Sequence, residues 1–180
     1  MNKILISLIV AFVGQSVLAE TLACTQRQSS FNCLVCNCFY ETRGEPKVGK
    51  IAVAKTVLSR VASDEFPDSI CAVVFQPSQF SWVSDSNTNT INVKKPEDIL
   101  ALKECKEASN IAMDEGANGL LYFYNPRKAS PAWARRMTNC GRAGEHVFMV
   151  PRGTTCPRNL GGNTPANPQQ RRSSTGGATR

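Results

Sequence analysis

Two glutamates on either side of a predicted chain break are the first candidates for chemistry in this sequence. The stretch FYETRGEP places Glu41 and Glu45 around an Arg-Gly pair, directly after Phe39 and Tyr40. Burial among apolar side chains disfavours the charged form of a carboxyl group, and a glutamic acid that stays protonated near neutral pH can donate a proton. The stretch therefore contains a candidate general acid, with Phe39 and Tyr40 as its apolar cover.

The apolar residues before Glu41 predict the element that positions it. Five apolar residues between Phe31 and Phe39 recur at the spacing i, i+3, i+4, i+7 and i+8, which is one face of an α-helix. Glu41 falls at the edge of this face in the last helical turn, because Gly44 and Pro46 end the helix. Burial and the C-terminal end of the helix dipole should both raise the pKa of Glu41.

Glu45 lies beyond that helix end, so its spacing of four from Glu41 does not place both carboxyl groups on one helical face. We expect Glu45 to accept hydrogen bonds from the first amides of the next helix, which should run from Lys47 to Ala62. The guanidinium of Arg43 should pair with Glu45 or with a substrate.

The rest of the chain predicts more helix than strand. A third helix should begin at Pro96, with acids in its first turn, and stop at Gly116. The segments GLLYFYNP and GEHVFMV have the aromatic and β-branched content of strands, and SPAWARRM suggests a short helix. These elements predict an α+β fold, mainly α, in which a small antiparallel sheet accompanies the helices.

The first 19 residues have the layout of a secretory signal peptide. Lys3 precedes an unbroken apolar stretch from Ile4 to Val13, and Ala19 ends an acceptable cleavage site. The apolar part is shorter than the roughly 20 residues of a membrane-spanning helix. We therefore expect a secreted or periplasmic protein without an integral membrane span after processing, and a retained N-terminal anchor is the alternative.

All eight cysteines lie beyond the predicted cleavage site, and an even number in an exported chain predicts disulfides. Cys33 and Cys36 fall on the outer face of the first helix, where they could tie it to outside segments. We expect a disulfide between Cys71 and Cys105, since both lie in apolar segments. A zinc cluster or a redox site in the segment CLVCNC is the alternative, but His146 is the chain's one histidine.

The formal net charge is +7, and the end of the chain contributes much of it. Residues 157–180 contain four Arg, no acid and almost no apolar residue, which predicts a disordered basic tail after a single domain of residues 20–156. A basic exported protein suits anionic envelope polymers rather than nucleic acid. Solubility alone is the simpler interpretation of this charge.

Several blocks of the sequence resemble the SleB/CwlJ family of bacterial cell-wall hydrolases. FYETRGEPKVGKIAVAKTVLSRV and FPDSICAVVFQPSQFSW match its first blocks, and YFYNPRKASPAWA and GEHVF match its closing ones, in the family's order. The resemblance spans Cys33 to Val150. It implies a lysozyme-like catalytic domain that cuts peptidoglycan glycan strands. Together with the cysteines, which are more than we expect for the family, it predicts a disulfide-stapled single domain with no metal or other cofactor.

On this resemblance, Glu41 becomes the catalytic acid. The candidate substrate-binding residues are Arg43, Glu45, Gln79, Phe80, Ser81, Trp82, Tyr124, Asn125, Trp133 and His146. His146 has a structural, hydrogen-bonded role as its alternative. The chain departs from many members at Tyr122 and Tyr124, where those members have histidines, and this argues against a general-base histidine there.

The leading hypothesis is a monomeric peptidoglycan-cleaving enzyme that cuts between N-acetylmuramic acid and N-acetylglucosamine. The sequence offers no second acid on the Glu41 face, which favours a lytic transglycosylase with one catalytic glutamate. A muramidase-type hydrolase would need a second carboxylate, for which Glu45 and Asp85 are the candidates. A non-catalytic, disulfide-rich module that binds glycan through its aromatic residues is the alternative of a different class. A zinc amidase would lack its usual histidine ligands.

Overall fold

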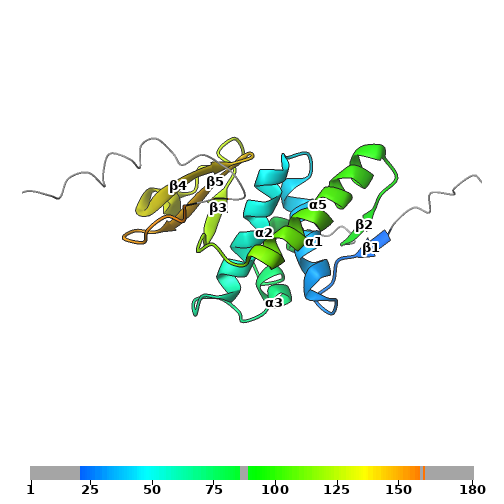
Figure 1. The fold of residues 1–180 in the computed structure, drawn as a ribbon, viewed down its shortest axis with the longest axis horizontal. Helices are drawn as coiled ribbons and strands as arrows, with labels where there is room; N and C mark the ends of the chain where they lie inside the picture. Colours follow the sequence, from blue (N-terminus) through cyan, green and yellow to red (C-terminus); the bar gives the residue numbers. More distant parts are fainter. Residues whose placement is uncertain (1–20, 86–88, 159, 161–180) are drawn as a thin grey trace, which may run out of the picture.

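The computed structural model describes residues 21–85, 89–158 and 160. At its centre, helices α1 (Ser30–Thr42), α2 (Lys47–Val61) and α5 (Pro96–Glu115) pack against one another, and the short α3 (Ile70–Val74) contacts α1 and α2 (Figure 1). The remaining elements are α4 (Ser81–Ser84), η1 (Ala132–Arg136), β1 (Thr21–Ala23), β2 (Thr90–Asn92), β3 (Tyr122–Tyr124), β4 (Met137–Ala143) and β5 (His146–Pro151). The predicted boundaries of α2 and α5 are confirmed to within one residue, and α1 ends before Gly44, as expected.

The strands of the described residues form two small antiparallel sheets on opposite sides of the helices (Figure 1). Strand β1 pairs with β2, and β5 lies between β3 and β4. The sequence predicts β3 and β5 but not β4, whose residues MTNCGRA alternate only weakly in polarity and carry a register shift between Asn139 and Gly141. The expectation of a mainly α fold with a small antiparallel sheet is confirmed.

Helix α2 connects the helical part of the molecule to the three-stranded sheet. On one side, its residues Ala54 and Val57 join the apolar core that α1 and α5 share. On the other, Ala52 and Val53 pack in a second cluster with Phe148 of β5. Small side chains on α2 let the neighbouring backbones approach closely, and Gly49 has room for no side chain. Helix α2 is therefore positioned to form one wall of a site between the helices and the three-stranded sheet.

The break between α1 and α2 separates Glu41 from Glu45. Ser29 is the N-cap of helix α1, and its side chain accepts a hydrogen bond from the Asn32 amide at 3.2 Å. The helix ends before Gly44, which adopts a left-handed backbone with φ of 83°. The chain then turns into α2 directly after Pro46. Glu41 therefore stays on α1, whereas Glu45 lies in the turn.

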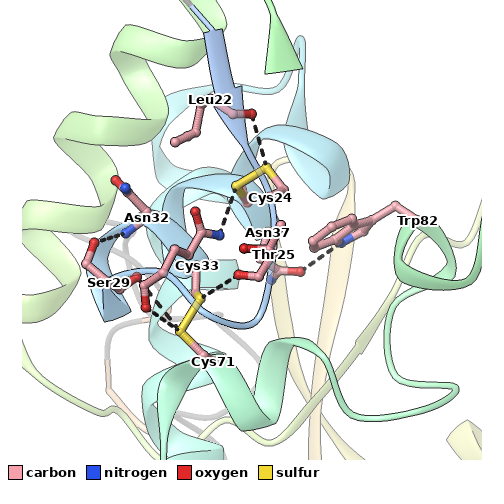
Figure 2. The surroundings of a disulfide bond; sticks show 11 residues. Leu22, Cys24, Thr25, Ser29, Asn32, Cys33, Asn37, Cys71 and Trp82 are labelled. Carbon is pink, nitrogen blue, oxygen red and sulfur yellow. Dashed lines mark hydrogen bonds between the residues drawn. A yellow bond between two sulfur atoms is a disulfide. The ribbon is translucent and has the colours of Figure 1, made fainter. Parts of the chain in front are cut away.

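Three of the four disulfides between described residues start from α1. They are Cys24–Cys36, Cys33–Cys71 and Cys38–Cys105, and the fourth is Cys140–Cys156. Figure 2 shows Cys33–Cys71 between α1 and α3, beside the backbone carbonyls of Thr25 and Ser29. The expectation that the outer face of α1 ties it to outside segments is confirmed.

The expected Cys71–Cys105 disulfide is wrong. Helices α3 and α5 each contact α1, and each offers its cysteine to a different residue of that helix: Cys71 to Cys33, and Cys105 to Cys38. The apolar setting of the two cysteines indicates burial correctly for Cys105. The apolar setting does not predict that helix α1 lies between these two cysteines and pairs with both.

The folded part of the chain continues past the predicted boundary at Cys156. Leu160 is buried in the same cluster as Phe148, and its carbonyl accepts a hydrogen bond from Asn118 Nδ2 at 3.1 Å. The predicted signal peptide and the remainder of the predicted tail lie outside the described residues. Among the helices of the described part, none is both long and apolar enough to cross a bilayer.

Candidate active site

A cavity of about 440 Å³ opens at the end of α1. Helices α1 and α2, the chain before and within α4, strand β3 with the loop after it, and the start of β5 all contribute to its walls. The lining residues are Tyr40, Glu41, Arg60, Ser78, Gln79, Phe80, Ser81, Ser84, Phe123, Tyr124, Asn125, Lys128, Ala129 and His146. The fold thus brings segments from the whole length of the domain to Glu41.

Glu41 is the one acidic residue among the described residues that line this cavity, and it is half-buried. Burial raises the pKa of its carboxyl group above the ordinary glutamate value, and the nearby Glu45 carboxylate adds to this rise. His146, Lys128 and Arg60 act in the opposite direction without cancelling the effect of burial. The carboxyl group therefore has the environment of a proton donor.

Glu45 is held by contacts that leave it little freedom. Its side chain is 8% exposed, its Oε2 accepts a hydrogen bond from the Glu145 amide at 2.9 Å, and its Oε1 lies 3.1 Å from Nδ1 of His146. The carboxylate lies against two glycines. A Cβ at Gly49 would lie 2.8 Å from Oε2, and one at Gly144 would lie closer still. Glu45 therefore fastens the turn before α2 to the turn between β4 and β5.

These contacts determine the charge of Glu45. Burial alone would raise the pKa of its carboxyl group, but the contact with His146, the Glu145 amide and the charge of Lys50 together hold that pKa below the ordinary value. The expectation that Glu45 caps the first turn of α2 is wrong, because α2 has no side-chain cap. The backbone amide that donates to Glu45 is that of Glu145, in the turn between β4 and β5.

His146 stands between Glu45 and the cavity. Its side chain is buried, lines the cavity, and meets the ring of Phe123 edge-on with 4.9 Å between the centroids. A carboxylate bound to one ring nitrogen fixes the orientation of an imidazole. His146 thus contacts the Glu45 carboxylate and also lines the cavity wall next to Glu41.

The predicted substrate-binding residues divide into three groups, one of which is Trp133 alone, in an adjoining cavity. Gln79, Phe80, Ser81, Tyr124, Asn125 and His146 line the cavity with Glu41. Arg43, Glu45 and Trp82 do not. Arg43 forms an ion pair with Asp98 of α5 at 2.6 Å.

Trp82 is turned inward instead of toward the cavity. It is 7% exposed, and its Nε1 donates a hydrogen bond to Asn37 Oδ1 at 3.2 Å (Figure 2). Its ring stacks on that of Tyr40 with 4.6 Å between the centroids. Trp82 therefore supports Tyr40, which lines the cavity, and does not itself present a surface to a ligand.

A second cavity of about 400 Å³ adjoins the first. Its lining residues are Arg60, Ser78, Gln79, Tyr122, Phe123, Trp133 and Met137, four of which also line the first cavity. Trp133 belongs here, where it is 37% exposed and lies 5.9 Å from the ring of Tyr122. The two cavities together extend the site from Glu41 to the three-stranded sheet.

Sequence reasoning missed Arg60 and Lys128, the two cations of the first cavity. Arg60 has a signal in the sequence, since it is a charged residue near the end of the apolar helix segment KVGKIAVAKTVLSRV. Lys128 lies in a loop whose composition gives no indication of its position. Within the part of the chain that the structure describes, no group of three or more His, Cys, Asp or Glu side chains is arranged to hold a metal ion.

Comparison with known proteins identifies relatives of this domain. Residues 44–149 match the model of the cell wall hydrolase family, a range that begins after Glu41. The spore cortex-lytic enzyme of Halalkalibacterium halodurans is 33% identical over 108 residues, which are 60% of this chain and 31% of that protein. The spore cortex-lytic enzyme of Bacillus cereus is 34% identical over 116 residues, or 64% of this chain and 42% of that protein. The chain thus spans less than half the length of these relatives.

Solved structures agree with the sequence matches. The catalytic domain of the germination-specific lytic transglycosylase SleB from Bacillus anthracis aligns with a TM-score of 0.55 and 27% identity, over 68% of this chain and 95% of that domain. The catalytic domain of the Bacillus cereus SleB protein aligns with a TM-score of 0.55 and 28% identity, over 68% and 91%. With the family match over more than half of its length, the chain belongs to the cell wall hydrolase family and has the fold of the SleB catalytic domain.

Proposed function

We propose that this protein is an exported enzyme that cleaves peptidoglycan glycan strands as a lytic transglycosylase, with Glu41 as the catalytic acid. The observation that carries the proposal is one half-buried carboxyl group of raised pKa in the cavity, without a second acid among the described lining residues. The relatives named as spore cortex-lytic enzymes and as a lytic transglycosylase support the class of substrate.

In this mechanism, Glu41 acts first as an acid and then as a base. Its proton passes to the oxygen of the glycosidic bond between N-acetylmuramic acid and N-acetylglucosamine. The bond from that oxygen to C1 of the muramic acid breaks, and the C1 centre gains positive charge. The Glu41 carboxylate then removes the proton of the C6 hydroxyl, whose oxygen bonds to C1. The product is a 1,6-anhydro ring, and no water is consumed.

The environment of Glu45 argues against a mechanism with two carboxylates. A retaining or an inverting hydrolase needs its second carboxylate at the sugar, as nucleophile or as base for a water molecule. Both carboxylate oxygens of Glu45 are engaged by Glu145 and His146, and Glu45 does not line the cavity. Asp85 does not line it either. One glutamate that serves twice is the chemistry that this cavity supports best.

The polar lining residues are the proposed contacts for the sugar. Gln79, Ser81 and Asn125 can offer amide and hydroxyl groups to glycan hydroxyls, and Tyr124 adds an aromatic wall. Arg43, Glu45 and Trp82 would act from behind these walls. In this proposal the partner is the glycan strand of the cell wall, which a secreted or periplasmic monomer would reach after removal of residues 1–19.

Exchange of Glu41 tests the proposal. Glu41→Gln keeps the size of the side chain but removes the transferable proton, so the release of soluble fragments from purified peptidoglycan should fall by at least about 100-fold. Glu107→Gln is a matched control, since Glu107 lies far along α5 and pairs with Lys47. It should keep native activity. A fully active and folded Glu41→Gln protein would remove Glu41 from the mechanism.

A further inference from the structure

Helix α2 carries three buried cationic side chains, and one of them lacks a carboxylate partner. Lys50 forms an ion pair with Glu104 at 3.2 Å, and Lys55 forms one with Glu115 at 2.5 Å. Arg60 is 5% exposed and forms no ion pair with any carboxylate of the described residues. An unpaired buried charge is costly to a folded protein, so this difference calls for a physical reason.

The contacts of Arg60 hold its guanidinium in place without neutralising it. Its Nε donates a hydrogen bond to the Leu121 carbonyl at 2.8 Å, and the guanidinium carbon lies 5.1 Å from the ring centroid of Phe66 and 5.4 Å from that of Phe80. Its Nη1 is buried and has no hydrogen-bond partner among the described residues. Burial lowers the pKa of Arg60 to about 10, which leaves it charged at neutral pH. The site is built to hold a cation with spare hydrogen-bonding capacity.

Arg60 lies where the two cavities meet. It lines both of them, together with Ser78, Gln79 and Phe123. Ser78 has a left-handed backbone with φ of 64°, the one non-glycine residue of the described chain with positive φ. Such backbone strain is uncommon outside glycine and gathers at ligand sites. The wall next to Arg60 therefore includes a residue, Ser78, with a strained backbone.

The second cavity combines the Arg60 guanidinium with aromatic walls. Its other walls are the aromatic rings of Tyr122 and Trp133 and the side chain of Met137, and no carboxylate of the described residues lines it. Glu65 contacts this wall and accepts a hydrogen bond from the Tyr122 hydroxyl at 3.2 Å, while the charge of Glu41, which lines the first cavity, also acts on Arg60. Aromatic side chains beside a planar guanidinium form a pocket for a group that is partly apolar and ends in a carboxylate.

We propose that Arg60 and the second cavity form an anion-binding subsite that takes the free lactyl carboxylate of N-acetylmuramic acid. The inference rests on the proposed function, because it takes the glycan to lie along both cavities. A guanidinium binds a carboxylate through charge-assisted hydrogen bonds that are stronger than those between neutral groups. The bound carboxylate would supply for Arg60 the counter-charge that Glu104 and Glu115 of α5 supply for Lys50 and Lys55.

This subsite would require another enzyme to act on the glycan strand first. In peptidoglycan that carries stem peptides, the lactyl carbon is an amide and bears no charge. The free carboxylate appears only after the amide bond to the peptide is hydrolysed. The preferred substrate is then a strand from which an amide-hydrolysing enzyme has already removed the peptides.

The experiment compares peptide-free glycan strands that carry the free lactyl carboxylate with the same strands after methyl esterification. A hydrogen bond between charged groups corresponds to about 10- to 100-fold in rate or affinity, so the native protein should cleave the carboxylate form at least about tenfold more efficiently. Arg60→Met should cleave both forms equally, and Arg60→Lys should keep part of the preference. Lys55→Met, which changes another buried cation of α2, should keep all of it.

A binding measurement separates failure of this inference from failure of the proposed function. Calorimetry with Glu41→Gln protein should give tighter binding of the carboxylate strands than of their methyl esters, whether or not cleavage occurs. Equal cleavage and equal binding of the two forms would overturn the anion subsite and leave glycan cleavage standing. Cleavage of neither form by the native protein would overturn the proposed function, and the binding preference would then decide on the subsite. Should Arg60→Met not fold, Arg60→Lys and the native protein on the two substrates give the answer.

Discussion

Glu41 and Glu45 lie four residues apart but in opposite environments. Glu41 ends α1 and faces a cavity in which burial raises the pKa of its carboxyl group. Glu45 lies in the following turn, where a backbone amide and His146 stabilise its charged form and lower its pKa. Two carboxyl groups with pKa values shifted in opposite directions can divide the work, so that one transfers protons and the other maintains structure.

The two shifts predict opposite effects on stability. Because the folded pKa of Glu41 is raised, the folded protein binds a proton that the unfolded chain has released, and stability falls as pH rises from the ordinary glutamate pKa to the raised value. Glu41→Gln should therefore unfold at a higher temperature than the native protein at pH 7. Activity that needs protonated Glu41 should persist above the ordinary glutamate pKa and decline as pH passes the raised one.

Glu45→Gln provides the opposite case. The lowered pKa of Glu45 contributes stability above the ordinary glutamate pKa, and this contribution is lost as pH falls through the lowered value. The exchange should destabilise the protein by about 1–3 kcal/mol at pH 7 and by much less in acid. Thermal unfolding from pH 3 to pH 8 measures both variants. Equal destabilisation by the two exchanges at pH 7 would show that their environments do not differ in this way.

The sequence could predict where Glu41 lies on its helix but not the partner of Glu45, and the range of the interactions explains why. The position of Glu41 follows from apolar spacing within one helix, which is local information. The donor to Glu45 is the amide of Glu145, one hundred residues away. Trp82 shows a related limit, because its type suggested a glycan contact while the buried Asn37 that binds its indole nitrogen turns it inward.

Helix α1 owes its placement to covalent links as well as to packing. Cys33, Cys36 and Cys38 bind it to α3, to the segment after β1 and to α5, respectively. These links hold the helix that carries Glu41 against the elements on either side. Local propensity predicted α1, α2 and α5, whereas strand β4 and the disulfide partners depend on contacts that no single segment contains.

Removal of individual disulfides should reveal their unequal contributions. The Cys38–Cys105 bond closes a loop of sequence separation 67, and Cys24–Cys36 one of separation 12. In the chain-entropy description, replacing both cysteines by alanine should cost about 4 kcal/mol for the first pair and about 3 kcal/mol for the second. Denaturant unfolding of the two double variants checks this order. A larger loss from the shorter loop would show that the loop closed by each disulfide does not determine its contribution.

At the scale of the whole molecule, packed residues of the described chain extend beyond Cys156 to Leu160. Leu160 packs beside Gly141, with Phe148 in the same cluster, and accepts a hydrogen bond from Asn118. A protein that stops after Leu160 should match the unfolding free energy of the full chain, whereas one that stops after Cys156 should lose about 2–3 kcal/mol through the missing side chain. Equal stability of both truncated proteins would show that Leu160 is not part of the folded unit.

The comparisons cover different shares of the two kinds of relative. The chain aligns with nearly all of two SleB catalytic domains, while it spans less than half of the longer cortex-lytic enzymes. The order of motifs along the sequence predicted the family and the mainly α fold. The meeting of Arg60, Ser78 and Trp133 at the second cavity needed the three-dimensional structure, because these residues come from three separate elements or loops.

The identity of the sugar ends released from purified peptidoglycan tests the central claim most directly. Mass spectrometry of fragments formed in heavy-oxygen water should find 1,6-anhydromuramic ends without the heavy isotope, since the C6 hydroxyl and not water attacks C1. Glu41→Gln protein should release no such ends. Ordinary reducing ends that carry the heavy isotope would contradict transglycosylation and assign the reaction to hydrolysis, with a water molecule activated by a second group.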